Sequence, residues 1–179
     1  LSKRSIKFPS SATTNELAIQ ILINTERNIL LIINQLLNER SIRFQWGKIG
    51  SHLEFESFFL PLSTSGESLL RVSKNLSSAI VMQRNECFYI SNLIYNTNRR
   101  ITKLDNLLKW KIANNSSDLN QTRISLHQSN IFHLFDRFCF VNDKIGACIF
   151  NEHTVVIINF ESNALSCKHF GYGRIRDIF

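Results

Sequence analysis

The sequence lacks most of the features from which catalytic sites and membrane spans are built. Its longest apolar run, residues 29–33, is far shorter than the roughly 20 residues that cross a bilayer. Only six glycines occur, and none forms the G-x-G-x-x-G pattern of a phosphate-binding loop. Kinase signatures, a nucleophile elbow and a Ser-His-Asp order are also missing. These absences favour a binding module over an enzyme, and we expect neither catalytic residues nor a cofactor.

The four cysteines are widely spaced and form no C-x-x-C pair: Cys87, Cys139, Cys148 and Cys167. A zinc site needs close-set ligand pairs, and no such cysteine or histidine spacing occurs. All four lie in apolar or strand-like surroundings, where a free thiol behaves as a small hydrophobe. The sequence therefore predicts free core thiols in an intracellular protein and no metal site.

Basic residues exceed acidic ones. The chain has 21 Lys and Arg against 14 Asp and Glu, a formal net charge of +7. This excess favours an acidic partner, which could be nucleic acid, a phosphoprotein or an acidic protein face. The first residues contain no Met and no apolar signal segment, so we expect a piece of a longer soluble protein.

Two helices and ten strands are predicted along the chain. A capping-box pattern, Thr13 to Glu16, precedes apolar residues at helical spacing and predicts a helix over 13–38. Asn and Thr at 96–98, followed by a second apolar periodicity, predict a helix over 96–113. Short β-branched and aromatic runs between turn residues predict strands. These cover 43–49, 52–60, 68–73, 78–83, 86–91, 132–141, 145–150, 154–160, 164–170 and 174–178.

An internal repeat connects the two halves of the chain. Lys-Ile-Gly-Ser at 48–51 recurs as Lys-Ile-Gly-Ala at 144–147, an offset of 144 − 48 = 96 residues. Read with the predicted elements, the repeat indicates an α+β fold with three segments. Residues 1–41 would be a helical cap, 42–115 a first sheet-and-helix unit, and 116–179 a second unit without its own C-terminal helix.

Several of these segments resemble polo boxes. Residues 141–158 (Val-Asn-Asp-Lys-Ile-Gly-Ala-Cys-Ile-Phe-Asn-Glu-His-Thr-Val-Val-Ile-Ile) resemble the second polo box of polo-like kinases. Residues 65–72 (Ser-Gly-Glu-Ser-Leu-Leu-Arg-Val) are similar to a turn and strand of the first box, and 99–104 to the start of its helix. The resemblance covers roughly residues 42–179. Divergent boxes of centriole-duplication kinases and kinetoplastid kinetochore proteins are the closer analogy.

The resemblance implies two antiparallel sheets, each with a helix, packed as a sandwich, and a preceding helical segment. It also implies an intracellular protein at a kinetochore or centriole that docks partner proteins or peptides, with or without a kinase domain upstream. The family's groove binds phosphorylated Ser/Thr motifs through a His and a Lys two residues later. His153 holds the first position, but Val155 holds the second. We therefore expect little discrimination between phosphorylated and plain peptides.

The candidate partner-binding residues are all basic: His153, Arg99, Arg100, Lys103, Arg174 and Arg176. His153 could face an anionic ligand or be an ordinary hairpin histidine. The cluster at 99–103 could grip an acidic partner or be a solvated helix face. Arg174 and Arg176 share one side of a predicted strand, as a basic patch or as charges guarding an edge. Two other functions stay open: a nucleic-acid-associated module, and an obligate dimerisation or assembly domain.

Overall fold

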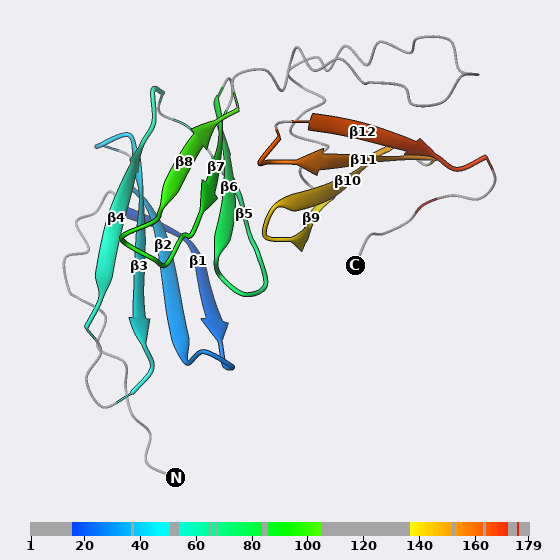
Figure 1. Cartoon of the computed structure of the whole chain (residues 1–179). Coiled ribbons are helices and arrows are strands. Elements are labelled where there is room, and N and C mark those ends of the chain that lie inside the picture. Colours follow the sequence, from blue (N-terminus) through cyan, green and yellow to red (C-terminus); the bar gives the residue numbers. More distant parts are fainter. Residues whose placement is uncertain are drawn as a thin grey trace. The chain divides into compact units, whose positions relative to one another are not determined.

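The computed structural model describes twelve β-strands in three four-stranded antiparallel sheets (Figure 1). None of the described residues is helical, and no membrane-spanning helix occurs among them. The α+β expectation is therefore wrong. The chain divides into two compact units, Leu1–Ser65 and Gly66–Phe179. The described residues are 16–36, 38–50, 54–64, 66, 68–83, 86–104, 137–151, 153–162, 164–171 and 175.

The first unit holds a meander, in which each strand pairs with the next one along the chain. Its strands are β1 (Glu16–Asn24), β2 (Ile29–Leu36), β3 (Ser41–Lys48) and β4 (Glu56–Pro61). Pro61, which cannot donate a ladder hydrogen bond, ends the edge strand β4.

The helix predicted over 13–38 is wrong, because most of this stretch is the β1–β2 hairpin. The turn is set by two asparagines. The Asn24 side-chain oxygen accepts a 2.9 Å hydrogen bond from the backbone N–H of Arg27. Asn28 adopts a left-handed φ of 53°, which asparagine tolerates better than most residues. Apolar residues flank this turn on both sides. Because their spacing also fits a helix, the sequence pattern predicted one continuous helix where the chain reverses direction.

The two faces of the β1–β4 sheet differ in exposure. One face is buried and aromatic, with Phe44 stacked on Phe58 at a centroid distance of 4.8 Å. Residues that pair across neighbouring strands share a face, and successive residues of one strand point to opposite faces. Ile21, Ile23 and Phe59 therefore lie on the other face. Their side chains are 53%, 58% and 49% exposed. The sheet therefore has one buried face and one face with exposed apolar side chains.

The second unit contains two further meanders. The first consists of β5 (Leu69–Val72), β6 (Ser78–Gln83), β7 (Glu86–Ser91) and β8 (Arg100–Lys103). The second consists of β9 (Phe138–Asn142), β10 (Ile145–Asn151), β11 (Thr154–Asn159) and β12 (Ala164–His169). The strands predicted from residue 68 to 91 and from 145 to 170 are confirmed within a few residues. The strand predicted over 174–178 lies almost wholly outside the described residues.

The helix predicted over 96–113 is wrong where the structure describes it. Residues 96–98 are a turn, and Arg100–Lys103 form strand β8. The rest of that segment and the linker at 114–118 lie outside the described residues. Ile101 pairs with Ile90 of β7, so the basic residues that were assigned to a helix surface decorate a strand instead.

The repeat with an offset of 96 residues is also wrong. Ile49 follows the end of β3, whereas Ile145 is the first residue of β10. The strands of 41–61 and those of 69–103 belong to different sheets. The short match at 48–51 and 144–147 therefore joins unrelated positions.

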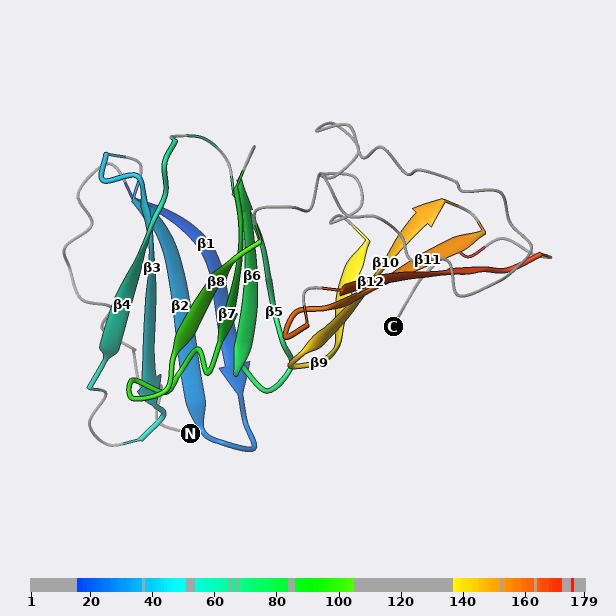
Figure 2. The same ribbon diagram turned by 45° about the horizontal axis from the view of Figure 1, so that its top comes forward.

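Side chains from the two sheets of the second unit meet in one buried core. The β5–β8 sheet contributes Ile80, Met82, Cys87 and Tyr89, and the β9–β12 sheet contributes Phe138, Cys148, Val156 and Ile158, with Phe160 beside them. Tyr89 stacks on Phe160 at 4.6 Å between ring centroids. The first strands of the two sheets, β5 and β9, lie side by side (Figures 1 and 2). Cys87 and Cys148 are buried thiols, as predicted.

Candidate partner-binding surface

Strand β8 is the edge strand that carries three of the predicted binding residues. The order of the sheet is β5-β6-β7-β8, so among the described strands β8 pairs with β7 alone. All four of its residues are exposed. Arg100 and Lys103 belong to this strand, and Arg99 directly precedes it. The structure thus gathers Arg99, Arg100 and Lys103 at one sheet edge.

Arg99 has an internal structural role. Its Nε donates to the carbonyl of Leu93 at 3.0 Å, and a terminal guanidinium nitrogen donates to Asn96 Oδ1 at 2.9 Å. Asn92 closes the same turn by donating from its side chain to the carbonyl of Asn98 at 2.9 Å. The Arg99 guanidinium therefore holds the turn between β7 and β8 in shape.

Lys103 neutralises a nearly buried carboxylate. Its Nζ lies 3.0 Å from Glu86 Oε1, and the Glu86 side chain is only 8% exposed. The same ammonium lies 5.9 Å from the centre of the Phe88 ring, within the range of a cation–π contact. Burying a carboxylate without a paired cation costs free energy. The Lys103 ammonium therefore stabilises the ionised form of Glu86 within the sheet. Arg100 is the exposed cation at this edge that has no such role in the described structure.

His153 lies in the turn between β10 and β11, in the other sheet. It is half-buried, and its carbonyl accepts a 2.8 Å hydrogen bond from the N–H of Phe170. Val155, at the position where the resemblance places a lysine, pairs across the sheet with Lys168. The Lys168 ammonium lies 5.8 Å from the centre of the Phe170 ring. Arg174 and Arg176 lie outside the described residues.

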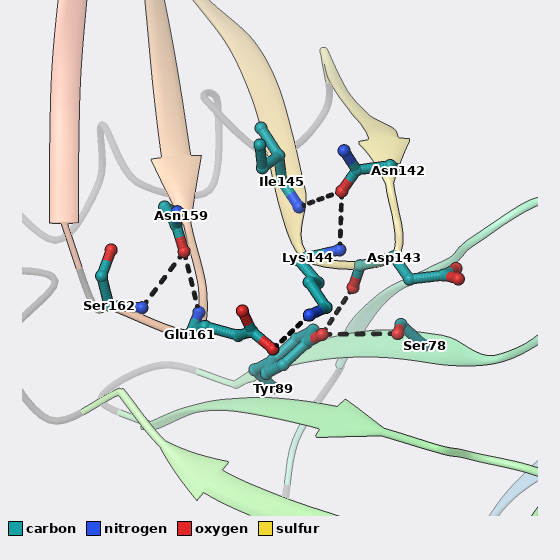
Figure 3. A network of polar contacts seen from close by, with 9 residues as sticks. All are labelled: Ser78, Tyr89, Asn142, Asp143, Lys144, Ile145, Asn159, Glu161 and Ser162. Atoms are coloured by element: carbon teal, nitrogen blue, oxygen red, sulfur yellow. Dashed lines mark hydrogen bonds and ion pairs between the residues drawn. The ribbon is translucent and has the colours of Figure 1, made fainter.

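A polar network joins the two sheets, and sequence reasoning missed it (Figure 3). The hydroxyl of Tyr89, on β7, donates to the backbone carbonyl of Asp143, in the β9–β10 turn. Ser78 Oγ lies 3.4 Å from the same hydroxyl. Lys144 and Glu161 form an exposed ion pair of 2.7 Å beside it. The network fixes the β9–β10 turn against the centre of the β5–β8 sheet.

Asn75 strengthens this junction from the β5–β6 loop. Its side-chain nitrogen donates to Asp143 Oδ2 at 2.6 Å. Its oxygen accepts from Ser73 Oγ at 2.8 Å and from the Oγ and N of Ser77 at 2.7 and 3.1 Å. Leu76, inside this loop, is buried with a left-handed φ of 62°, a conformation that costs energy for a branched side chain. The bonds around Asn75 hold that strained backbone in place.

Two asparagines shape the neighbouring turns and offered a sequence signal. Asn142 Oδ1 accepts 2.9 Å hydrogen bonds from the N–H groups of Lys144 and Ile145. Asn159 Oδ1 likewise accepts from the N–H groups of Glu161 and Ser162 at 3.0 and 3.1 Å. Both are side-chain turns typical of asparagine at a strand end. An asparagine directly after an apolar run is therefore the sequence pattern that could have predicted these hairpin turns.

Burial shifts the titration of two groups in the core. It raises the pKa of the Tyr89 hydroxyl above its usual value; the Ser78 contact opposes this effect and the Asp143 charge adds to it. Burial also raises the pKa of the Cys87 thiol strongly, so this thiol stays protonated and unreactive. Both groups therefore act as neutral packing elements at neutral pH.

The described part of the chain holds no group of three or more His, Cys, Asp or Glu side chains placed to bind a metal ion. No protein-family model, no curated protein and no solved structure matches the chain.

Proposed function

We propose that the chain is a non-catalytic docking module that binds an extended acidic segment of a partner protein along strand β8. The observation that carries this proposal is the edge strand itself. All four of its residues are exposed, and among the described strands only β7 pairs with it. An extended peptide can add to such an edge as a further strand, with backbone hydrogen bonds for affinity and side chains for selectivity.

The side chains on this edge combine apolar contact with positive charge. Ile101 is 46% exposed, and Tyr95, in the preceding turn, is exposed to the same extent. Ile101 and Lys103 alternate with Arg100 and Thr102 on opposite sides of the strand. A peptide with alternating acidic and apolar residues complements this pattern. The net charge of +7 also favours encounter with an acidic segment.

The way the cations are used favours a peptide over nucleic acid. Nucleic-acid binding draws most of its affinity from several cations that neutralise phosphates. At this edge Arg99 holds a turn and Lys103 pairs with Glu86. Arg100 alone is a single cation, which is too few to neutralise several phosphates. One cation is sufficient to orient one acidic side chain of a peptide. The buried core next to β8, which includes Tyr89 and Leu104, holds the edge strand in a fixed position.

Fluorescence anisotropy with a labelled peptide of alternating Glu and Val residues tests the proposal. We expect saturable binding that Arg100→Glu weakens about tenfold or more, or about 1.4 kcal/mol. Lys48→Glu, which makes the same change of net charge at the end of β3, should leave binding unchanged. A Lys-Val peptide of equal length should not bind.

A 20-base-pair DNA duplex serves as the competing ligand in the same assay. If duplex DNA binds with a steep decrease of affinity in salt and the Glu-Val peptide does not bind, the proposal is wrong and the chain is a nucleic-acid module. Equal weakening by Arg100→Glu and Lys48→Glu would show that only overall charge matters, which also contradicts docking at β8. Kinship with polo boxes and a kinetochore or centriole location stay predictions, and docking at β8 does not depend on them.

A further inference from the structure

The backbone of β8 directs its hydrogen bonds alternately to β7 and to the open edge of the sheet, and one bond sets the phase. The N–H of Leu104, directly after β8, donates to the carbonyl of Cys87 at 2.7 Å. These two residues continue the register of the β7–β8 ladder. In an antiparallel ladder, hydrogen-bonded pairs alternate with pairs that are not hydrogen-bonded. Thr102 and Arg100 therefore bond to β7, whereas the N–H and C=O of Ile101 point to the open edge.

A second hydrogen bond, at the other side of the same sheet, gives the same phase. The N–H of Ser73 donates to the carbonyl of Ser78 at 2.8 Å, in register with the β5–β6 ladder. Because the direction alternates from residue to residue, Val81 of β6 must bond to β7, where it lies opposite Phe88. Phe88 is thus directed to β6, and the residues on either side of it are directed to β8. Cys87 is one of these residues, as the first bond requires.

The side chains of β8 are divided between the two faces of the sheet. Ile101 is 46% exposed and lies opposite the buried Ile90 of β7. Lys103 shares the face of Ile101, and its ammonium forms the ion pair with Glu86. Arg100 is exposed and points to the other face. An added strand therefore meets an apolar side chain at a hydrogen-bonding position, and a cation one residue further along on the other face.

We propose that the partner segment adds to β8 as an antiparallel strand, with an apolar residue opposite Ile101 and an acidic residue directly after it, opposite Arg100. This inference rests on docking at β8 and specifies the direction and register of the partner. The apolar residue exchanges both backbone hydrogen bonds with Ile101, which directs its N–H and C=O outward. The acidic residue and Arg100 form a non-hydrogen-bonded pair, in which the Cα atoms are about 4.5 Å apart and the side chains lie closer than in a hydrogen-bonded pair.

The acidic residue is assigned to Arg100 because the other cation on β8 already has a carboxylate. The Lys103 ammonium lies 3.0 Å from Glu86 Oε1. A second carboxylate opposite Lys103 would lie near that of Glu86, and like charges close together on one sheet face repel each other. The position opposite Arg100 is on the other face and avoids this repulsion.

The surrounding sheet favours the antiparallel direction. Its ladders β5–β6, β6–β7 and β7–β8 are all antiparallel. Antiparallel pairing is slightly more stable per residue than parallel pairing, and purely antiparallel sheets are over-represented. A parallel partner would need the reverse order, with the acidic residue directly before the apolar one. The order of these two residues in a peptide therefore reports the direction of the added strand.

Competition in the anisotropy assay tests this order. Short peptides of Ser and Thr carry one Val and one Glu at the centre, either as Val-Glu or as Glu-Val, and displace the labelled repeat peptide. We expect the Val-Glu peptide to bind at least about threefold more tightly, which is the size of one cross-strand pair. Arg100→Ala should abolish the preference, whereas Lys48→Ala, at the end of β3, should retain it.

Methylation of single backbone nitrogens in the Val-Glu peptide tests the register and leaves the protein unchanged. A methyl group on the Val nitrogen removes the donor to the Ile101 carbonyl, so binding should weaken at least about tenfold. The Glu nitrogen points away from β8 in the proposed register. A methyl group on it should therefore change the affinity much less.

Proline substitutions test the same alternation in the protein. Ile101→Pro removes an N–H that points to the open edge, and proline is tolerated at such positions of edge strands. This variant should stay folded and lose peptide binding, whereas Ile101→Val, which retains the N–H, should bind as the wild type does. Thr102→Pro removes an N–H that bonds to β7 and should lower the melting temperature.

Several results would overturn the inference while docking at β8 stands. Tighter binding of the Glu-Val order would mean a parallel strand, and equal binding of the two orders would mean that Arg100 does not select the acidic residue. A larger effect of methylation at Glu than at Val would move the register by one residue. Failure of every peptide to bind, including the labelled repeat, would instead contradict docking at β8 itself.

Discussion

Replacement of Gly146 by alanine should destabilise the chain through one identifiable clash. Gly146 lies in β10 between Phe140 and Ile158 of the neighbouring strands. A Cβ built on it falls well inside van der Waals contact with the Phe138 ring and 3.1 Å from Phe160 Cζ. The Phe138 ring is held in turn by a T-shaped contact with Phe140, at 5.2 Å between centroids. It therefore has little freedom to move aside.

The expected cost is that of overpacking a close-packed core, about 1–3 kcal/mol. For a chain of this size each kcal/mol lowers the melting temperature by roughly 2–4 °C. Gly146→Ala should therefore melt about 2–12 °C below the wild type in a circular-dichroism scan. The matched control is Gly171→Ala, where a Cβ meets nothing within 4 Å. Alanine is expected to be neutral there, or stabilising by up to about 1 kcal/mol because it restricts the unfolded chain.

The double variant Gly146→Ala/Phe138→Leu identifies the cause. Phe138→Leu alone should destabilise, since it removes buried ring atoms. If the ring is the obstacle, the double variant should be more stable than the sum of the two single costs predicts, by about 0.5–3 kcal/mol. Strict additivity, or equal melting temperatures for Gly146→Ala and Gly171→Ala, would refute the reasoning and show that the Phe138 ring is not an obstacle to a side chain at this glycine.

Three further predictions concern the junction and the β8 edge. Tyr89→Phe should lower the free energy of unfolding in urea by about 1–3 kcal/mol, because it leaves the Asp143 carbonyl without its donor; Tyr95→Phe, at an exposed site, should change it little. Since the folded state raises the pKa of Tyr89, its contribution is fully present below the ordinary tyrosine pKa and is lost as pH rises through the raised one. Urea titrations from about pH 9 to 11 should therefore show a steeper loss of stability in the wild type than in Tyr89→Phe, and parallel losses would contradict the shift. Arg99→Ala should lower the free energy of unfolding by about 1 kcal/mol, because it removes two hydrogen bonds. Arg100→Ala should change the free energy of unfolding by no more than about 0.5 kcal/mol. Equal losses in the two variants would mean that Arg99 does not hold the turn.

The strands of the second unit were predictable because their signals are local. Alternating β-branched and aromatic residues between turn residues predicted β6, β7, β10 and β11 within a few residues of their observed bounds. A strand–turn–strand pattern depends on side chains that are neighbours in sequence. The buried thiols Cys87 and Cys148 were predicted for the same reason, since each lies within such an apolar run.

The helices were mispredicted because apolar residues at helical spacing are also compatible with strands. In the β1–β2 hairpin, apolar residues on both sides of the Asn24–Asn28 turn satisfy a helical pattern. A short apolar run does not by itself distinguish the two structures. Pairing with β3, whose Phe44 lies opposite Ile33, decides in favour of the strand, and that pairing depends on the whole sheet.

The sequence by itself determined the basic charge, the asparagine turns and the alternation of side chains, because each depends on residue identity alone. The tertiary structure decided which of these features meet. It places Arg99, Arg100 and Lys103 at one sheet edge. There Arg99 forms hydrogen bonds within a turn, and Lys103 forms an ion pair with Glu86. It also placed the hydroxyl of Tyr89 against the carbonyl of Asp143, 54 residues away. Such contacts form where two sheets share a core, and packing between distant segments leaves no local pattern in the chain.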